Sequence, residues 1–234
     1  MNKLICVASL TCMFFFAPPA TAQEDVNILL KKVGDKIDQV NNYEATGKMK
    51  TNVTFLKVPE SAVKIYFKKP DKLKIRNEKG ISFVPKGAVS INLSAIINGH
   101  KYTAIDAGTE KLGTTNVRVV KLLPQDDNAD VVLSTLYIDE KNLVIKQAKT
   151  TTRENGSYQL EMTYGKYIAF GLPAKINFTF NTRDYKLPKG VTFDFDDGTQ
   201  QKKTAAEDAR KNKGMAEITF DSYIINKGVP DTVF

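Results

Sequence analysis

The chain has no tryptophan, one histidine and only two cysteines among its 234 residues. Cys6 and Cys12 both lie in an N-terminal segment that we expect to be removed, so the mature protein would form no disulfide and offer no thiolate. His100 follows the Asn98-Gly99 turn, where an exposed turn residue is a simpler interpretation than a catalytic base. Without disulfides the fold must be stabilised by apolar burial, which a chain of this length can achieve as one domain.

Motifs for catalysis and metal binding are missing as well. The sequence contains no Gly-x-Ser-x-Gly elbow, no Walker loop and no His-x-x-x-His pair. In Asp194–Gly198 the third acid and the glycine come one position too early for a calcium loop, and Asp126–Asp130 reads as an acidic turn. We therefore predict no metal, no cofactor and no enzyme. A carboxylate-pair hydrolase stays open as an alternative, because such pairs leave no sequence signature.

Residues 1–22 have the pattern of a signal peptide. Lys3 provides the positive charge, residues 4–17 the apolar stretch, and Ala20-Thr21-Ala22 the cleavage site. The apolar stretch is short for a membrane anchor, and the residue before Cys12 is unsuited to a lipid-anchored cysteine. We therefore expect a cleaved, exported protein.

The mature chain is predicted to be a single domain over residues 23–234, with a mobile loop at 184–214. The formal net charge of the whole sequence is +8. Lysines interleaved with acids along strands and turns indicate a solvated surface, and contact with anionic lipid headgroups is the alternative. The export signal and the lack of a basic block argue against nucleic-acid binding.

An amphipathic helix is predicted after Asp25, whose carboxylate can cap it. Apolar side chains recur at helical spacing while charged residues occupy the opposite side. The apolar positions are Val26, Leu29, Leu30, Val33, Ile37 and Val40. A helix of this kind must lie on an apolar surface.

The rest of the chain alternates apolar and polar residues with the period of β-strands. In residues 63–75 two alternating runs flank Pro70, which lacks an N–H and must interrupt the ladder. A long strand is predicted from Tyr43 to Val58, in which Gly47 marks a bulge or the close approach of the helix. The pattern predicts a mostly β (α+β) fold. In it a curved antiparallel sheet forms an incomplete barrel, covered by the N-terminal helix and lid segments.

The Lys69-Pro70-Asp71-Lys72-Leu73 corner resembles that of the periplasmic lipoprotein-carrier (outer-membrane lipoprotein-sorting) superfamily, whose fold is an incomplete β-barrel closed by helices. The resemblance continues in order through Leu29–Val40, Tyr43–Ala45, Val119–Pro124, Tyr137–Lys141, Gly156–Tyr164, Leu172–Ile176 and Phe220–Val229. Three features depart from that pattern. Lys69 stands where the best-studied members have arginine, the tryptophans of their cavities are absent, and the linker Lys186–Gly214 has no obvious counterpart.

The resemblance implies a soluble carrier in the periplasm of a Gram-negative bacterium that holds the acyl chains of lipoproteins. An inner-membrane release complex and an outer-membrane acceptor would be its partners, and we expect a monomer. A sixteen-carbon chain loses on the order of 12 kcal/mol on moving from membrane to water, so transport needs an apolar compartment. The alternative is a non-enzymatic envelope sensor or apolar-ligand-binding protein on the same fold.

The residues predicted to bind acyl chains are apolar positions on one face of the sheet. They are Met49, Val53, Phe55, Ile65, Phe67, Leu73, Ile75, Leu160, Met162, Ile176 and Phe178, with Leu29, Leu30, Val33 and Ile37 as the lid. Lys69 is placed at the rim, where it would contact a headgroup or tie the lid, and a solvated turn lysine is the alternative. The same apolar residues would equally form a filled core, so this pattern leaves cavity and core open.

Overall fold

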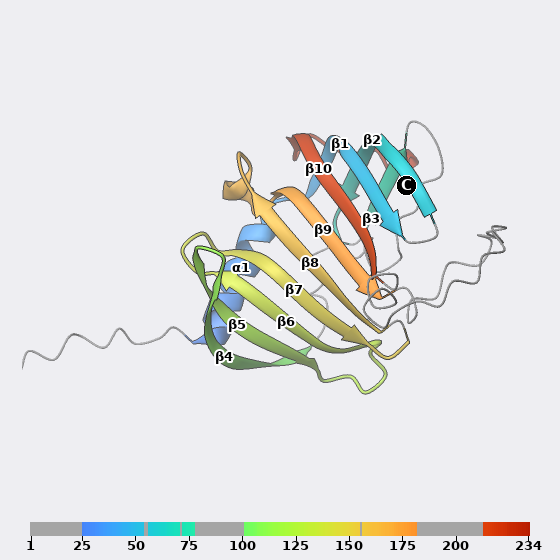
Figure 1. Ribbon diagram of the computed structural model, residues 1–234. Coiled ribbons are helices and arrows are strands. Elements are labelled where there is room, and N and C mark those ends of the chain that lie inside the picture. The colour runs from blue at the N-terminus through green and yellow to red at the C-terminus, as the bar shows by residue number, and fades with distance from the viewer. Residues whose placement is uncertain (1–24, 54–55, 71, 78–100, 155, 182–212) are drawn as a thin grey trace, which may run out of the picture.

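The computed structural model describes residues 25–53, 56–70, 72–77, 101–154, 156–181 and 213–234 (Figure 1). Within these ranges one α-helix lies against one face of a single large antiparallel sheet that is not closed into a barrel. The predicted fold class, an open curved sheet with a covering helix, is confirmed. The face that α1 covers is called the inner face below, and the opposite face the outer face. Within the described ranges no helix has the length and hydropathy needed to cross a bilayer.

Helix α1 (Val26–Asp38) begins where its sequence predicts. The backbone N–H of Asn27 donates to Oδ1 of Asp25 at 2.8 Å, so Asp25 caps the first turn. Val26, Leu29, Leu30 and Val33 are buried, whereas Ile28 on the far side is half exposed. The helix is therefore held by one apolar stripe.

The described residues after the helix form ten strands, and neighbours along the sheet run antiparallel in the order β3-β2-β1-β10-β9-β8-β7-β6-β5-β4. They are β1 (Asn42–Val53), β2 (Leu56–Lys68), β3 (Lys72–Asn77), β4 (Tyr102–Leu112), β5 (Thr115–Pro124), β6 (Val131–Asp139), β7 (Val144–Thr152), β8 (Ser157–Tyr164), β9 (Pro173–Asn181) and β10 (Lys213–Ile225). The short 3-10 helices η1 (Ile168–Phe170) and η2 (Asp231–Val233) precede β9 and follow β10. Strand β10 joins the first strands to the later ones, because it pairs with both β1 and β9.

The prediction of one strand from Tyr43 to Val58 is wrong. β1 ends at Val53 and β2 begins at Leu56, and the two pair with each other from Val53–Leu56 to Asn42–Lys68. No Gly, Pro or Asn-Gly signal lies between Val53 and Leu56. The local sign of the reversal is that Phe55 and Leu56 are adjacent apolar residues, which breaks the period-2 alternation there. The strands predicted at 81–84 and 88–93, the Asn98-Gly99 turn and most of the predicted loop at 184–214 lie outside the described residues.

Gly47 marks a bulge, which was one of its two predicted roles. The register between β1 and β10 shifts between Thr46 and Gly47. A Cβ atom at Gly47 would lie 2.2 Å from the backbone oxygen of Thr219, so only glycine allows the two strands to approach this closely.

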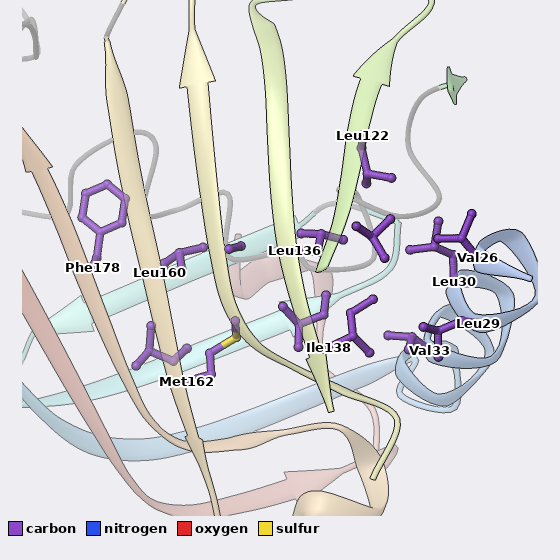
Figure 2. Packing of buried hydrophobic residues seen from close by; sticks show 14 of the residues in the cluster. Val26, Leu29, Leu30, Val33, Leu122, Leu136, Ile138, Leu160, Met162 and Phe178 are labelled. Atoms are coloured by element: carbon purple, nitrogen blue, oxygen red, sulfur yellow. The ribbon is translucent and has the colours of Figure 1, made fainter. Parts of the chain in front are cut away.

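Beneath α1 the inner face is filled with side chains. Leu29, Leu30 and Val33 are at most 2% exposed, and they belong to one apolar cluster with residues of the central strands. Figure 2 shows this cluster, in which the helix faces Leu136 and Ile138 while Leu160, Met162 and Phe178 extend it across the sheet. This half of the inner face is a packed core.

Candidate functional site: an apolar cavity beside the edge strand

An apolar cavity of about 60 Å³ lies at the other half of the inner face, where α1 ends. Strands β3, β2, β1, β10 and β9 form its floor, and the end of α1 with the segment around η1 forms its roof. The lining residues are Ile37, Val40, Tyr43, Ile65, Phe67, Leu73, Ile75, Phe170, Gly171, Leu172, Pro173, Ile176, Ile218, Phe220 and Tyr223. None of them carries a charge at neutral pH.

The polar atoms of the lining belong to tyrosines. The hydroxyl of Tyr223 donates to the backbone oxygen of Pro173 at 2.8 Å, which ties β10 to the start of β9. Burial raises the pKa of both Tyr43 and Tyr223 far above the usual value for a phenol, so both rings are neutral. The ring of Tyr43 stacks on Phe67 with centroids 5.2 Å apart and meets Tyr223 edge-on at 5.3 Å. This part of the cavity wall is thus aromatic, and the whole wall is uncharged.

The volume limits what the cavity holds in this conformation. An engineered cavity of about 150 Å³ accommodates benzene, so about 60 Å³ admits only the end of an apolar chain. The roof segments Ile37 and Phe170–Leu172 would have to move away from the sheet before a long acyl chain could enter. Phe170 is 38% exposed, and Leu73 and Ile75 are partly exposed, so the cavity meets solvent between η1 and the edge strand β3.

Some of the predicted acyl-binding residues line the cavity, and others lie in the packed core. Five of them line the cavity together: Ile65, Phe67, Leu73, Ile75 and Ile176. Met49 is buried in the apolar cluster beside it. Leu160, Met162 and Phe178 lie in the packed core under α1. Phe55 is outside the described residues, and of Val53 only the backbone is described.

The predicted lid residues divide in the same way. Leu29, Leu30 and Val33 belong to the packed core, whereas Ile37, one turn further along α1, lines the cavity. The last turn of the helix is therefore the part that borders the candidate site.

Several lining residues were not predicted. Ile218, Phe220 and Tyr223 come from β10, which reaches the cavity through its pairing with β1. Ile218 and Phe220 alternate in the sequence, whereas Tyr223 is out of phase with them. It faces inward because the register of β10 on β1 shifts between Thr46 and Gly47. The segment Phe170–Pro173 carried a local signal in Gly171, which adopts φ +67° after η1 and turns the chain into β9.

Lys69 connects the sheet to the end of α1. Its Nζ donates to the backbone oxygen of Asp38 at 2.6 Å and lies 3.2 Å from the carboxylate of the same residue. Its backbone N–H donates to the oxygen of Asn41 at 2.9 Å. The carbonyls of a last helical turn lack partners within the helix, and a cation placed there is stabilising.

Two further contacts fix the same end of the helix. The side chain of Asn226 donates to the oxygen of Gln39 and accepts from the N–H of Asn41, both at 2.8 Å. Nζ of Lys36 donates to the oxygen of Asn142 at 2.6 Å, in the turn between β6 and β7. The end of α1 that borders the cavity is thus held by polar contacts as well as by apolar packing.

A buried ion pair lies at the opposite end of the sheet, between β4 and β5. The Arg118 side chain is 3% exposed and forms a bidentate pair with the carboxylate of Asp106. Glu140 lies 3.8 Å from the guanidinium. The hydrogen bonds from Arg118 hold the pKa of Asp106 below its usual value. This pair neutralises a buried charge in strands that contribute nothing to the cavity lining.

No protein-family model matches the chain, and no curated protein matches its sequence significantly. Solved structures do match its fold. A domain assigned to outer membrane lipoprotein-sorting proteins from Vibrio parahaemolyticus aligns with a TM-score of 0.58 at 11% identity, covering 88% of this chain and 94% of the other. A DUF1329 family protein from Desulfovibrio piger gives 0.57 at 12% identity, with 89% and 95% covered. A LolA superfamily protein from Nitrosomonas europaea gives 0.53 at 10% identity, with 88% and 96% covered.

These alignments run over nearly the whole length of each matched chain. The chain therefore shares the fold of these proteins, as the resemblance predicted. The TM-scores of 0.53 to 0.58 carry this conclusion, and at 10–12% identity it extends to the fold alone.

Proposed function

We propose that this protein is an exported, periplasmic carrier that binds the acyl chains of lipoproteins in the cavity between η1, the end of α1 and the edge strand. The observation that supports this most directly is the cavity lining, which is uncharged throughout and reaches solvent at one edge. Apolar ligands are stabilised by such a wall through the removal of apolar surface from water. The proposed function is binding and release without a chemical step.

Loading would require the roof to open. The first part of α1 is fixed in the packed core. Opening of the roof would therefore move the last turn of α1 and the segment Phe170–Leu172. Lys69 would close the roof through its contact with Asp38. Acyl chains would come from a membrane-bound release complex and pass to an outer-membrane acceptor, with the carrier acting as a monomer.

A small-molecule sensor on the same fold is the second candidate, and the cavity volume favours it. A cavity of about 60 Å³ suits a ligand much smaller than a lipoprotein acyl chain. Binding of such a ligand would leave the roof closed.

Mass spectrometry of lipid extracted from the purified full-length protein tests the first candidate. Acyl species of lipoprotein or phospholipid length are expected, and a uniformly lipid-free protein would contradict it. Because the chain has no tryptophan, Leu73→Trp places a unique fluorophore at the cavity rim. A brominated fatty acid should quench that indole strongly. It should leave the indole of Leu112→Trp, a partly buried site in the cluster of Val117 and Val119, unaffected. Equal quenching of both variants would count against the cavity as the binding site.

A further inference from the structure

The outer face of the β2–β3 hairpin is strongly basic. Alternation places Lys64 and Lys68 of β2 on this face, and Lys72, Lys74 and Arg76 of β3 beside them. Lys64 lies directly opposite Arg76, and Lys68 directly opposite Lys72. Like charges in directly opposed cross-strand pairs are destabilising, so packing within the hairpin does not account for this arrangement. We call these five residues the basic face.

The C-terminal segment lies over part of the basic face. The carboxylate of Asp231 is 3.0 Å from Nζ of Lys68 and 2.9 Å from Nζ of Lys72. Further along, Nζ of Lys74 donates to the backbone oxygen of Phe234 at 3.4 Å, and Arg76 donates to that of Val233 at 3.1 Å. The segment therefore presents the Asp231 carboxylate and two main-chain oxygens to four of the five cations. Glu44 of β1, opposite Tyr66, borders the basic face on the neighbouring strand.

The same hairpin forms the edge of the cavity. Ile65 and Phe67 of β2 and Leu73 and Ile75 of β3 point to the inner face and line the cavity, while their neighbours in sequence carry the cations. β3 is the outermost strand of the described sheet on this side. A surface that binds the basic face therefore also lies next to the opening of the cavity.

We propose that the basic face docks on an anionic phospholipid bilayer, and that Asp231 is an internal competitor for the same cations. The inference gives the proposed carrier the membrane as a partner and rests on that function for its purpose. The binding itself does not depend on a ligand in the cavity.

The arrangement favours a bilayer over an acidic protein. Cations stand at every second residue of two adjacent strands, and four of the five are lysines. Once the C-terminal segment is displaced, these flexible point charges suit a plane of headgroups more than one buried ion pair. Aromatic rings that favour the interface accompany them, because Arg76 lies over Tyr66 at 5.7 Å and Lys72 over Phe234 at 5.9 Å. An acyl chain leaving such a bilayer would reach the cavity along the edge strand without crossing water.

Vesicle flotation with the full-length mature protein tests the proposal. Vesicles of phosphatidylcholine alone are compared with vesicles that also contain phosphatidylglycerol, at low and at physiological salt. Binding is expected only to the anionic vesicles and should weaken as salt rises. Lys68→Glu with Lys72→Glu should reduce binding at least tenfold, given about fivefold per cation at a membrane surface. Asp231→Asn should increase it several-fold.

Matched controls separate docking from general charge. Lys111→Glu with Lys121→Glu makes the same charge change on exposed residues of β4 and β5, at the opposite end of the sheet, and should reduce binding far less. Equal losses from both double variants would overturn the proposal, and so would unchanged or weaker binding by Asp231→Asn. Binding to soluble polyglutamate with the same variant pattern, without binding to vesicles, would assign the basic face to an acidic protein instead.

The membrane-docking surface and the acyl-chain carrier function can be rejected independently of each other. Lipid-free protein whose vesicle binding still depends on Lys68 and Lys72 would reject the carrier and retain the docking surface. If the protein binds acyl chains but never associates with anionic vesicles, the carrier function is retained and the docking surface is rejected. Thermal unfolding of each variant excludes misfolding as the cause of a loss, and the neutral pair Lys68→Gln and Lys72→Gln provides a milder second test.

Discussion

Nζ of Lys69 lies 2.6 Å from the backbone oxygen of Asp38 and 3.2 Å from its carboxylate, so a corner of the sheet holds the last residue of α1. The side chain of Lys69 is 29% exposed. The contact combines a charge-assisted hydrogen bond with a cation at a helix C-terminus, and both stabilise the docked position of the helix end. Two roles were considered for Lys69 at the rim, contact with a headgroup and tying of the lid, and the bond to Asp38 is of the second kind.

Replacing Lys69 by methionine should loosen this end of the helix. The free energy of unfolding should fall by about 1 kcal/mol, because the lost bond is charge-assisted but partly exposed. Hydrogen exchange at the amides of Gln39 and Val40, which bond to the oxygens of Lys36 and Ile37, should accelerate. Lys74→Met serves as the control, since the side chain of Lys74 donates to the backbone oxygen of Phe234 and not to the helix. Equal exchange in the two variants would mean that Lys69 does not hold the helix.

The two ends of α1 should respond differently to truncation. Leu30 is 2% exposed in the packed core, so Leu30→Ala should lower the free energy of unfolding by about 2 to 4 kcal/mol. Ile37 already borders a cavity and is partly exposed, so Ile37→Ala should cost about 1 kcal/mol and enlarge the site. Urea unfolding curves give both values. A larger loss at Ile37 than at Leu30 would show that the cavity end, not the core end, anchors the helix.

Gly47 should tolerate no side chain. A methyl group there would lie 2.2 Å from the backbone oxygen of Thr219 and 3.1 Å from Cα of Phe220, so β1 and β10 would have to separate. Gly47→Ala should destabilise the protein by more than about 2 kcal/mol, measured by chemical denaturation. Gly165→Ala is the matched control, because its new methyl group would meet only the Cβ of Ala174, at 3.4 Å. If Gly47→Ala leaves the free energy of unfolding nearly unchanged, β1 and β10 can separate at this point at little energetic cost.

Local patterns predicted much of this fold. The helix start at Asp25, the stripe from Val26 to Val33 and the Pro70 corner each depend on residues close in sequence, and each was found as predicted. The same alternation identified Ile65 and Phe67 as inner-face residues. Such features follow from side-chain spacing and from the missing N–H of proline.

What escaped prediction depends on which strands pair. The reversal after Val53 becomes definite only once β1 pairs with β2. Tyr223 faces the cavity because β10 pairs with β1 and its register shifts beside Gly47. The bond from Lys69 to Asp38 spans 31 residues, and that from Asn226 to Gln39 spans 187. Alternation assigns a residue to a face, but the pairing of distant strands decides which part of that face becomes core and which part borders a cavity.

The pair formed by Arg118 and Asp106 predicts a pH-dependent contribution to stability. The pKa of Asp106 in the folded protein lies below its unfolded value of about 3.9, because Arg118 and the N–H of Gly108 donate hydrogen bonds to its carboxylate. Its stabilisation is therefore complete above about pH 4 and is lost as the pH falls through the lower, folded pKa. Asp106→Asn should be less stable than the native protein at neutral pH, and the difference should shrink in acid.

The measurement is urea unfolding of the native protein and the variant between neutral pH and about pH 3. Asp127→Asn, in the exposed turn between β5 and β6, is the control, because it removes one carboxylate from a turn outside the Arg118 pair. Asp106→Asn should also weaken the β4–β5 end of the sheet, since a guanidinium buried as deeply as that of Arg118 is destabilising once its carboxylate partner is neutral. A stability difference that stayed constant with pH would show that Asp106 acts through shape and not through charge. In that case Glu140, 3.8 Å from the same guanidinium, would be the partner that neutralises it.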